Sequence, residues 1–551
     1  MIRFVPRPLP GTAPFPGLEP WLSDLLRIRG ITTAEEADRF LNPRLSDLED
    51  PFLLQDMDKI VSLLRKAIAD RTPVMVWGDY DADGVCAAAI LTETLREEGA
   101  MVSWRLPSRH TEGYGLNETA VREIARDYGL LITVDCGISN LAEVALARSL
   151  GLTVIVTDHH VLPPELPDAD AVTSPLLGGY PCPHLCGAGV ALKICQALQG
   201  MSGVEKRLDL AAIATVADVV PLLGENRIIV REGLSRIASS PRPGLRALLE
   251  SAGTAPPLRA DHLAFRLAPR LNAAGRLETA DSAAELLLTG DPEEAARLAE
   301  RLETLNARRQ QLEKEMTAAA DAQALSRSDF DSTRVLMVIG SNWNPGLIGL
   351  TAGRLCTKYH KPAIALSLQD DVAVGSCRSI PGVHIFRMLQ SCGDLLERFG
   401  GHAQAAGLTV RKDQLRPFYQ RLNQVVRDSC DPACFEPVRE YDLALPFASW
   451  TPEMLEKLSL LEPTGCGNPE PAFLLPSASV QSMRRVGRDQ SHLQMTLLSG
   501  GTLLKGIAFS QGAEADKGYR DVDILYRPIL NEFRGKISVE AQVMALRPSN
   551  T

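Results

Sequence analysis

Residues 74–84 have the sequence Val-Met-Val-Trp-Gly-Asp-Tyr-Asp-Ala-Asp-Gly, in which an apolar run leads directly into three acids. The apolar run predicts a buried strand, and Gly84 would let the backbone turn away after it. Because Asp79, Asp81 and Asp83 lie so close together, they repel one another and raise one another's pKa. A bound cation would remove this conflict, and oxygen ligands suit Mg²⁺ or Mn²⁺. The alternative is an acidic loop that only faces solvent.

The pattern of an apolar run that ends in an acid occurs three more times. These runs are residues 130–134 before Asp135, residues 152–157 before Asp158-His159-His160, and residues 213–217 before Asp218. Helix-like stretches over 117–128 and 140–149 separate the earlier runs, so the pattern predicts a parallel α/β sheet. Ligands bind outside the carboxyl ends of the strands in such sheets. We therefore expect one rim to gather Asp81, Asp83, Asp135, His159 and Asp218.

Composition narrows the class of protein. The chain has 551 residues, which is enough for three or four domains, and it is 45% hydrophobic and 23% charged, as in ordinary globular proteins. Residues 1–10 hold no long apolar core, and no apolar run approaches the roughly 20 residues of a membrane helix. Eleven cysteines, an odd number, fit free thiols in a reducing compartment. We therefore expect a cytoplasmic protein.

A net charge of −10 argues against a protein that coats nucleic acid over its whole surface. A locally basic channel stays compatible with this charge, because a handful of Arg and Lys side chains is enough to bind phosphates. Two cysteine pairs have metal-like spacing, Cys182 with Cys186 and Cys430 with Cys434. Neither has a second half at zinc-finger distance, so a structural zinc and incidental thiols are both open.

The order of patterns along the chain predicts an α/β protein with two α/β lobes, a long connecting helix and a C-terminal β-barrel. The expected regions are a helical accessory segment over 1–70, a catalytic α/β domain over 71–235, a helical region with the long helix over 236–332, a second α/β domain over 333–440, and the barrel over 441–551. The long helix begins near Asp291, a good N-cap followed by Pro292. Asn306 and Arg309 interrupt its apolar seam and either face solvent or line a ligand cleft.

Two glycine-bearing polar loops, 375–382 and 400–407, could approach a phosphate closely, although many such loops are only turns. The expected barrel carries basic and aromatic residues, a mixture that suits single-stranded nucleic acid. They are Arg484, Arg485, Arg488, Lys505, Arg527, Arg534 and Lys536, with Phe509, Tyr526 and Phe533. The alternative is a solvated basic face over core aromatics.

These motifs resemble a known family. The stretches 79–84 and Asp158-His159-His160 are similar to the first and third motifs of the DHH phosphoesterases. Further stretches, 215–221, 269–277, the two glycine loops and 461–471, resemble in order the single-stranded-DNA-specific 5′→3′ exonucleases of that family, the last one where their OB-fold begins. The resemblance covers nearly the whole chain. It departs at Asn344, where the family usually has His after Trp, and at Ser174, where it usually has Asn before Pro.

The resemblance implies hydrolysis of phosphodiesters by two divalent cations, Mn²⁺ or Mg²⁺. Asp135 would bridge them, Asp81 would bind one, and Asp83, His159 and Asp218 the other, with Asp79 as a further ligand. His160 would touch the scissile phosphate, so that the catalytic groups are His160, Asp135 and Asp83. Arg276, Ser376 and Arg378 would hold the 5′ phosphate. Weaker candidates in the substrate cleft are Asn272, Asn306, Arg309 and His402.

By the same resemblance, the protein would release 5′-mononucleotides from single-stranded DNA in recombination and repair. It would be a monomer that works with a single-strand-binding protein and a helicase. One alternative is a DHH phosphodiesterase for short oligonucleotides or cyclic dinucleotides, which the chain length and the barrel disfavour. A second is an inactive scaffold of the same fold in a replication assembly, which the intact set of acids disfavours.

Overall fold

The computed structural model describes residues 2–11, 14–109, 111–533 and 536–549, and its chain divides into two compact units. Unit 1 consists of Met1–Ala37, Glu313–Leu461 and Glu470–Thr551, and unit 2 of Asp38–Leu312 and Glu462–Pro469. Both units are therefore built from segments that are far apart in the sequence. The segment 462–469 is the shortest of them and is flanked by unit 1 on both sides.

Unit 2 contains the parallel sheet that the sequence predicts. Its strand order is β3-β2-β4-β5-β6, and every pairing is parallel. The strands are β2 (Val74–Trp77), β3 (Val102–Arg105), β4 (Leu130–Val134), β5 (Thr153–Thr157) and β6 (Ala171–Thr173). The two expected helices also form, as α5 (Glu118–Asp127) and α6 (Leu141–Ser149). The Asn117 side chain caps α5 by accepting a hydrogen bond from the Ala120 amide at 2.9 Å.

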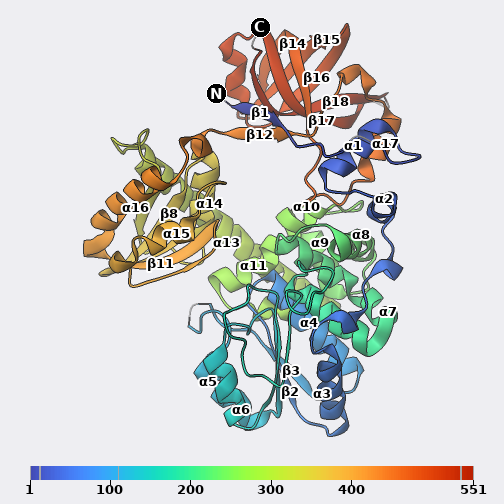
Figure 1. The fold of residues 1–551 in the computed structure, drawn as a ribbon, viewed down its shortest axis with the longest axis vertical. Coiled ribbons are helices and arrows are strands. Elements are labelled where there is room, and N and C mark those ends of the chain that lie inside the picture. Colours follow the sequence, from blue (N-terminus) through green and yellow to red (C-terminus); the bar gives the residue numbers. More distant parts are fainter. Residues whose placement is uncertain (1, 12–13, 110, 534–535, 550–551) are drawn as a thin grey trace. The chain divides into compact units, whose positions relative to one another are not determined.

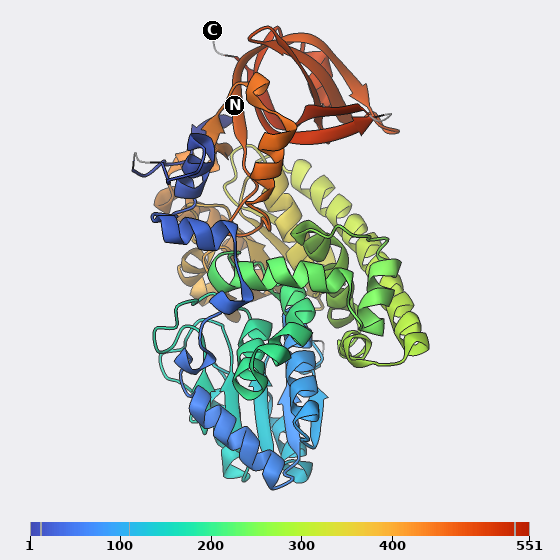
Figure 2. The ribbon, with the colours of Figure 1, turned by 90° about the vertical axis from the view of Figure 1, so that its right-hand side faces the viewer.

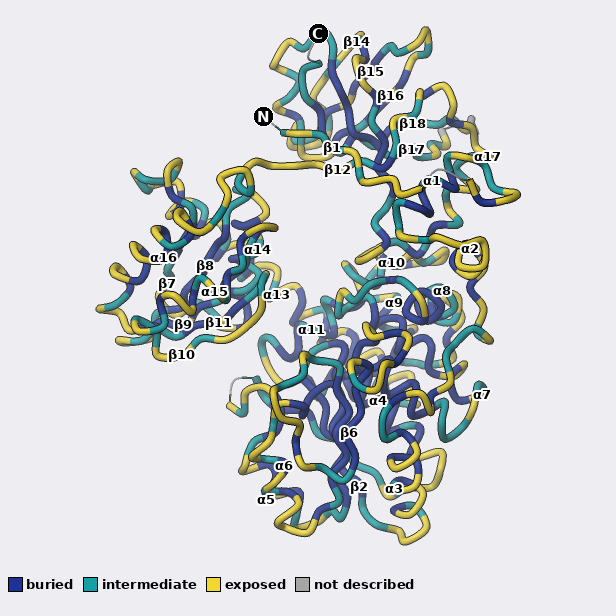
Figure 3. Tube along the Cα trace, in the orientation of Figure 1, coloured by how far each residue is buried: buried dark blue, intermediate teal, exposed yellow. Residues whose placement is uncertain are grey.

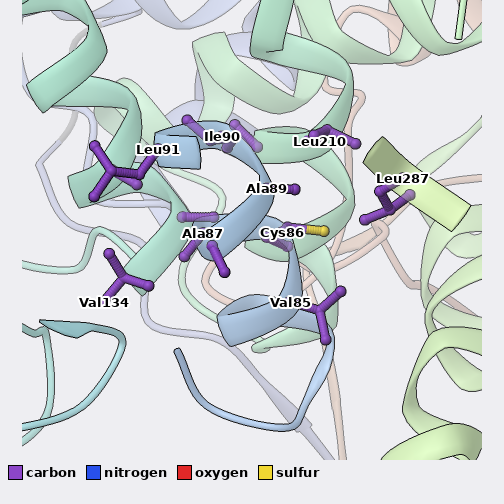
Figure 4. Packing of buried hydrophobic residues seen from close by; sticks show 14 of the residues in the cluster. Val85, Cys86, Ala87, Ala89, Ile90, Leu91, Val134, Leu210 and Leu287 are labelled. Atoms are coloured by element: carbon purple, nitrogen blue, oxygen red, sulfur yellow. The ribbon is translucent and has the colours of Figure 1, made fainter. Parts of the chain in front are cut away.

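Each face of this sheet packs against its own helices, because alternate side chains of a strand point to opposite faces. Val74 and Val76 join a core with α3 (Met57–Ala69), α4 (Ala82–Glu97) and α7 (Gly187–Ala217). Met75 and Trp77 join a second core with α5 and α6. Figure 3 shows these strands as buried. Figure 4 shows side chains of α4 in the first core, together with Val134, Leu210 and Leu287.

Residues 213–217 are not a strand that ends at the sheet's rim, as the recurring pattern suggested, but the last turn of α7. A short apolar run is compatible with a strand and with a buried helix, and here the helix is long and Ile213 is fully buried in the core. Asp218 is the residue at which α7 ends. It therefore reaches the site from a helix terminus rather than from a strand.

The rest of unit 2 is helical. Its helices are α2 (Ala34–Leu41), which begins in unit 1, α8 (Gly224–Ala238), α9 (Pro243–Ser251), α10 (Ala260–His262), α11 (Ala268–Leu277) and α12 (Asp281–Leu288). The predicted long helix is α13 (Pro292–Leu325), which runs from unit 2 into unit 1. The Asp291 side chain accepts a hydrogen bond from the Glu293 amide at 2.9 Å, as expected of a residue just before a helix.

Unit 1 contains a second, smaller α/β sheet with strand order β10-β11-β9-β8-β7. Its strands are β7 (Leu336–Ser341), β8 (Ala363–Gln369), β9 (Val372–Arg378), β10 (Arg398–Gly401) and β11 (Ala405–Arg411), with helices α14 (Ile348–Tyr359), α15 (Ile385–Gln390) and α16 (Leu415–Ser429). Only the β7–β8 pairing is parallel. Figure 1 labels several of these elements.

The C-terminal part of unit 1 is a closed β-barrel (Figure 2). It consists of β14 (Phe473–Val486), β15 (His492–Ser499), β16 (Thr502–Ala508), β17 (Asp521–Phe533) and β18 (Lys536–Pro548), with the short β13 (Leu443–Ala444) beside β14 and α17 (Pro452–Ser459) before it. Pairing of β14 with β17 closes the barrel and removes its free edges. The predicted barrel is thus confirmed.

The N-terminal segment differs from the all-helical expectation. It begins with β1 (Arg3–Pro6), which pairs in parallel with β12 (Val438–Tyr441), and only then continues into α1 (Pro20–Ile28). A four-residue strand whose only partner lies more than 400 positions away leaves no periodic signal in the local sequence. Among the described residues, no helix is both long enough and apolar enough to cross a membrane.

We expect Gly233→Ala to lower the melting temperature, because a Cβ atom there would lie 2.3 Å from the Ala212 Cβ and 2.6 Å from the Leu208 carbonyl oxygen. Forcing α8 away from α7 costs about 1–3 kcal/mol, more than the about 1 kcal/mol that alanine gains over glycine in a helix. The control is Gly353→Ala in α14, whose Cβ would meet nothing closer than 3.9 Å. Differential scanning fluorimetry should separate the two variants; equal melting temperatures would contradict this account of α7–α8 packing.

Candidate active site

The carboxyl ends of β2, β4 and β5 form one rim of the unit 2 sheet, and the predicted polar residues follow directly after them. Asp79 and Asp81 follow β2, Asp135 follows β4, and Asp158, His159 and His160 follow β5. Because these three strands are neighbours in the sheet, their acids and imidazoles are brought together. Asp218 joins them from the end of α7.

The loop after β2 is held in shape by the start of α4. The Asp81 carboxylate accepts hydrogen bonds from the amides of Asp83 and Gly84 at 3.0 and 3.1 Å, so it caps the helix. Gly84 was expected to turn the backbone, but it lies within α4. A glycine is required at position 84 for lack of space instead, since a Cβ atom there would lie 2.5 Å from the Asp79 backbone nitrogen and oxygen.

Asp83 is fixed by the first residues of α7. Its two carboxylate oxygens accept hydrogen bonds from the Gly187 and Ala188 amides, each at 2.7 Å. The N-terminus of a helix directs unpaired amides outward, so the start of α7 fixes the position of the Asp83 side chain. A Cβ at Gly187 would lie 2.4 Å from the Asp135 Cβ. This glycine therefore lets α7 reach Asp83 and Asp135 at once.

His159 lies among three carboxylates. Its Nε2 atom is 3.0 Å from Asp135 Oδ1 and 3.7 Å from both Asp83 Oδ2 and Asp218 Oδ2. Burial lowers the pKa of His159 below its usual value although the neighbouring carboxylates oppose this. A neutral imidazole is the form that binds a metal.

The side chains form sets with the composition of metal sites. The ligand atoms of Asp83, His159 and Asp218 all lie within 4.8 Å of one another, and so do those of Asp79, Asp81 and Asp135. A third such set joins Asp135, His159 and His160. Three buried atoms in these sets have no hydrogen-bond partner, namely Asp79 Oδ1, Asp135 Oδ1 and His159 Nε2. Because buried polar atoms are normally paired, these residues fit bound cations.

The carboxylates are strained electrostatically without a cation. Burial, together with the charge of neighbouring acids, raises the pKa of Asp79 and of Asp218 to about 8. The same two causes raise the pKa of Asp81 and, more strongly, that of Asp135. A divalent cation would reverse these shifts, because it favours the ionised form of each ligand.

His160 differs from His159 in charge and exposure. Its Nδ1 atom lies 2.7 Å from Asp158 Oδ1 and 3.1 Å from the Tyr114 hydroxyl. Although burial opposes the shift, the hydrogen bond with Asp158 raises the pKa of His160 to about 9. Asp158 also accepts hydrogen bonds from the amides of Ile138, His159 and His160. The His160 side chain is 41% exposed and therefore presents a positive charge to solvent.

Three residues near the rim, Asp158, Tyr114 and Arg109, were not among the predicted site residues. Asp158 stood in a quoted motif, so its position was visible, but nothing in the sequence showed that it accepts three backbone hydrogen bonds and charges His160. Tyr114 and Arg109 lie between β3 and α5, in a stretch that carries no recognisable motif. The Arg109 guanidinium lies 5.0 Å from the centre of the Tyr80 ring.

The predicted substrate residues of unit 2 lie beside the loop that follows β2. Asn272 Oδ1 accepts a hydrogen bond from the Ala82 amide at 2.9 Å. A Cβ at Gly275 would lie 2.4 Å from the Tyr80 carbonyl oxygen, so α11 packs closely on this loop. Burial raises the pKa of the Tyr80 hydroxyl, and the positive charges of Arg109 and Arg276 oppose that shift. Arg276 is therefore close enough to Tyr80 to act on its hydroxyl.

Asn306 and Arg309 contact each other on α13, where an Arg309 guanidinium nitrogen donates to Asn306 Oδ1 at 2.7 Å. Asn306 is buried, so this pair is not the fully solvated surface that was one of the two alternatives.

Ser376, Arg378 and His402 lie in unit 1. Ser376 and Arg378 are on β9, and the Arg378 guanidinium donates to Ser376 Oγ at 3.0 Å. A Cβ at Gly349 would lie 2.9 Å from an Arg378 nitrogen and 3.1 Å from Ser376 Oγ, so the start of α14 approaches both. His402 lies between β10 and β11. The predicted substrate residues thus fall into two sets, one in each unit.

Other predicted features have plainer roles. Asn344, which replaces the family's usual His, accepts a hydrogen bond from the Gly346 amide at 2.7 Å and shapes the turn before α14. Among the described residues, neither cysteine pair belongs to a set of three metal-binding side chains. Cys182 and Cys186 are buried thiols.

The basic and aromatic residues that were predicted for the barrel differ in exposure. Arg484, Arg485, Arg488 and Lys505 are exposed, as is Phe509. Tyr526 is fully buried and its hydroxyl accepts a hydrogen bond from the Trp450 indole at 2.8 Å, so it belongs to the barrel core and cannot stack on a base. Arg527 contacts Glu470. Arg534 lies outside the described residues, and only the backbone of Phe533 and Lys536 is described.

Three family models match the chain in sequence. They are the DHH family, N-terminal domain, over residues 73–217, the DHHA1 domain over 332–428 and the RecJ OB domain over 441–545. The acids and imidazoles gathered at the sheet rim lie within the first match, except Asp218, which follows it directly.

Several curated relatives carry the name single-stranded-DNA-specific exonuclease RecJ. Those of Salmonella typhimurium and Escherichia coli are 37% and 36% identical, over 96% of this chain and 96% of their own length. That of Bacillus subtilis is 39% identical over 90% of this chain, which spans only 63% of its length. A crystal structure of RecJ from Thermus thermophilus in complex with Mn²⁺ aligns with a TM-score of 0.85 and 32% identity, over all of this chain and 80% of the other.

The raised pKa of Asp218 predicts how stability depends on pH when EDTA removes metal. Between the usual carboxyl value of 3.8 and about 8, the folded protein keeps a proton that the unfolded chain has lost, so stability falls as pH rises. Asp218→Asn cannot ionise. Its melting temperature minus that of the wild type should therefore increase from about pH 5 to about pH 8 and then level off.

Thermal scans across this pH range test the prediction, with Asp394→Asn as the control. The ion pair with Arg421 holds the pKa of the exposed Asp394 below its usual value, so its carboxyl is ionised in both states throughout the range. A pH-independent difference for Asp218→Asn would mean that its carboxyl does not hold a proton in the folded protein.

Proposed function

The chain belongs to the family of RecJ single-stranded-DNA-specific exonucleases, and we propose that it degrades single-stranded DNA from the 5′ end by metal-dependent hydrolysis of phosphodiesters. The observation that carries the proposal is the group of buried and half-buried acids and imidazoles at the sheet rim, whose ligand atoms lie close enough together to hold metal ions and include three that have no hydrogen-bond partner. The products would be 5′-mononucleotides. The chemistry resides in unit 2.

We assign the ligands of two divalent cations, Mn²⁺ or Mg²⁺, from these sets. Asp83, His159 and Asp218 would hold one, and Asp79 and Asp81 the other. Asp135 would contribute to both, because it belongs to the second set and also lies 3.0 Å from His159. When bound, such cations lower the pKa of a water molecule and stabilise charge on the leaving oxygen. The helix amides that hold Asp83 keep its oxygens in place.

His160 is the group that we expect to contact the scissile phosphate. Its Nδ1–H bond to Asp158 keeps the imidazole charged at neutral pH, and the charged ring then has its Nε2–H left to donate to a phosphate oxygen. Tyr114 restrains the ring from a second side. Asp158 thus acts through His160, as a residue that orients it and sets its charge.

Arg276, Ser376 and Arg378 are proposed to bind the 5′ phosphate, since the planar guanidinium of arginine pairs with two phosphate oxygens at once. Asn272, Asn306, Arg309 and His402 are further candidates for contacts to the nucleotide chain. The barrel would bind the incoming strand through exposed side chains. Positive charge for its phosphates would come from Arg484, Arg485, Arg488 and Lys505, and a stacking surface for its bases from Phe509.

The proposal extends to the setting of the enzyme. It would act as a monomer in DNA recombination and repair, with a single-strand-binding protein and a helicase as partners. Eleven free thiols fit the reducing cytoplasm. The functional division stays as expected: an accessory segment over 1–70, catalysis over 71–235, a helical connection over 236–332, substrate binding over 333–440 and the OB-fold over 441–551.

We expect Asp135→Asn to lower the turnover number by at least about a thousandfold, because an amide cannot supply negative charge to two cations. The assay follows release of mononucleotides from a 3′-labelled single strand in Mn²⁺, with EDTA as the blank. Duplex-blocked 5′ ends should resist digestion. The variant should keep the wild-type melting temperature in EDTA, because burial and the neighbouring acids already raise the pKa of Asp135 and favour an uncharged side chain at this position. A folded variant with wild-type turnover would remove Asp135 from the metal centre.

The end-binding role of Arg276 has a separate test. With Arg276→Lys, the charge stays but the paired contact is lost, so we expect the preference for 5′-phosphorylated over 5′-hydroxyl strands to fall about tenfold. Arg301→Lys is the control, because Arg301 pairs with Glu278 near the end of α11 and is not among the residues proposed to bind the phosphate. Rates on the two kinds of strand give the ratio; an unchanged ratio in Arg276→Lys would exclude it from the end-binding set.

A further inference from the structure

Residues 462–469 pack in unit 2, which contains the proposed metal ligands, although in the sequence they lie just before the first long strand of the barrel. Residues on both sides of it, 313–461 and 470–551, lie in unit 1, whereas these eight residues belong to unit 2. Nothing in the proposed chemistry uses them. Their contacts in unit 2 lie on the turn that follows Asp218.

The turn over residues 219–224 is packed directly against this segment. The Leu222 amide donates a hydrogen bond to the Cys466 carbonyl oxygen at 2.8 Å. A Cβ at Gly465 would lie 2.8 Å from Leu222 Cδ1, and one at Gly467 would lie 2.8 Å from Pro221 Cβ. Gly467 also has a φ of +68°, which disfavours other residues. Two glycines thus allow an approach that side chains would prevent.

The backbone beside Asp218 is strained, so something must hold it. Val219 has a φ of +60°, in the left-handed region that β-branched residues rarely adopt. Its side chain is 67% exposed and gains little from packing. Such a conformation persists only where the surroundings determine it. The fixed neighbour is Leu222, which is buried with Val230 and Ala260 and bonded to Cys466.

The segment itself is anchored well enough to serve as a support. Arg227 of α8 is fully buried and donates to the carbonyl oxygens of Glu462 and Pro463 at 2.8 and 3.3 Å, and to that of Phe40 at 2.7 Å. Asn468 is also fully buried and donates to the Pro463 carbonyl oxygen at 2.9 Å. The Gly465 amide donates to the Asn468 carbonyl oxygen at 2.8 Å.

Asp218 needs such support, because no hydrogen bond among the described residues orients its carboxylate. Asp81 and Asp83 are oriented by backbone amides that bond their carboxylates. In the part of the chain that the structure describes, the Asp218 carboxylate accepts no hydrogen bond, and its nearest neighbour in the set, His159 Nε2, is 3.7 Å away. The position of this carboxylate therefore depends on its backbone, which the strained Val219 and the turn after it define.

We propose that residues 462–469 are a clamp that positions Asp218 for the cation it shares with Asp83 and His159. Gly465 and Gly467 are positioning residues, as are Asn468 and Arg227, and none of them touches the cation or the substrate. The inference rests on the proposed function in one respect, that this set of ligands binds a divalent cation.

Gly467→Ala tests the clamp in the full-length protein. The added methyl would press on Pro221 and move the turn. The control is Gly518→Ala in the barrel, where φ is +64° and a Cβ would meet nothing within 4 Å, so both variants carry the same backbone strain. Mn²⁺ binding without DNA, followed by electron paramagnetic resonance of free Mn²⁺, should show one of two sites weakened about tenfold in Gly467→Ala only.

Kinetics then separate positioning from general damage. In Gly467→Ala, the Mn²⁺ concentration for half-maximal activity should rise about tenfold, whereas kcat at saturating Mn²⁺ and the KM for DNA should match the wild type. Asn468→Ala, which removes the segment's internal bond without changing a glycine, should act in the same direction and serves if Gly467→Ala does not fold.

Each outcome bears on the clamp. If Gly467→Ala and Asn468→Ala both bind Mn²⁺ as the wild type does and only their melting temperatures fall, the clamp is overturned. The proposed function would then stay intact, because the segment would be structural only. Equal weakening in Gly518→Ala would also overturn it. A wild-type protein that binds no Mn²⁺ would overturn the proposed function itself, and the clamp with it.

Discussion

The mutual repulsion of buried carboxylates is the constraint on which this structure depends. Four strand or helix ends deliver acids to one rim, and burial makes each charge costly. The fold accommodates them with directed backbone amides: the start of α4 holds Asp81, the start of α7 holds Asp83, and the loop after β5 holds Asp158. The charges left uncompensated by these amides are those of Asp79, Asp135 and Asp218, and each of the three belongs to a set of side chains that could hold a metal ion.

This arrangement divides the two neighbouring histidines between different tasks. His159 lies deeper, is neutral because burial lowers its pKa, and faces the carboxylates of Asp83, Asp135 and Asp218. His160 is bonded to a carboxylate that backbone amides keep ionised, so it carries the charge that His159 lacks. The two adjacent histidines thus differ in protonation because they have different neighbours. The end of β5 directs one ring into the acid cluster and the other toward Asp158.

The features predicted from sequence were those with strong local patterns. The apolar runs before Asp79, Asp135 and Asp158 are short and abruptly polar at one end, so both the parallel strands and the shared rim followed from them. The run 213–217 has the same local appearance but lies in a helix, because the secondary structure of so short an apolar run is decided by the residues around it. Gly84, Tyr526 and the strand β1 were misjudged for a related reason: close approach, burial and distant pairing are set by residues elsewhere in the chain.

The return of residues 462–469 to unit 2 has a consequence for how the protein is made. A ribosome completes residues 38–312, with every proposed metal ligand, long before it reaches this segment. Until then Arg227 has no Glu462 or Pro463 carbonyl to bond, and the turn after Asp218 lacks its support. The unit is therefore completed only after residue 469 has been made, so a chain that stops before this segment would carry all of its rim acids without the support of the turn after Asp218.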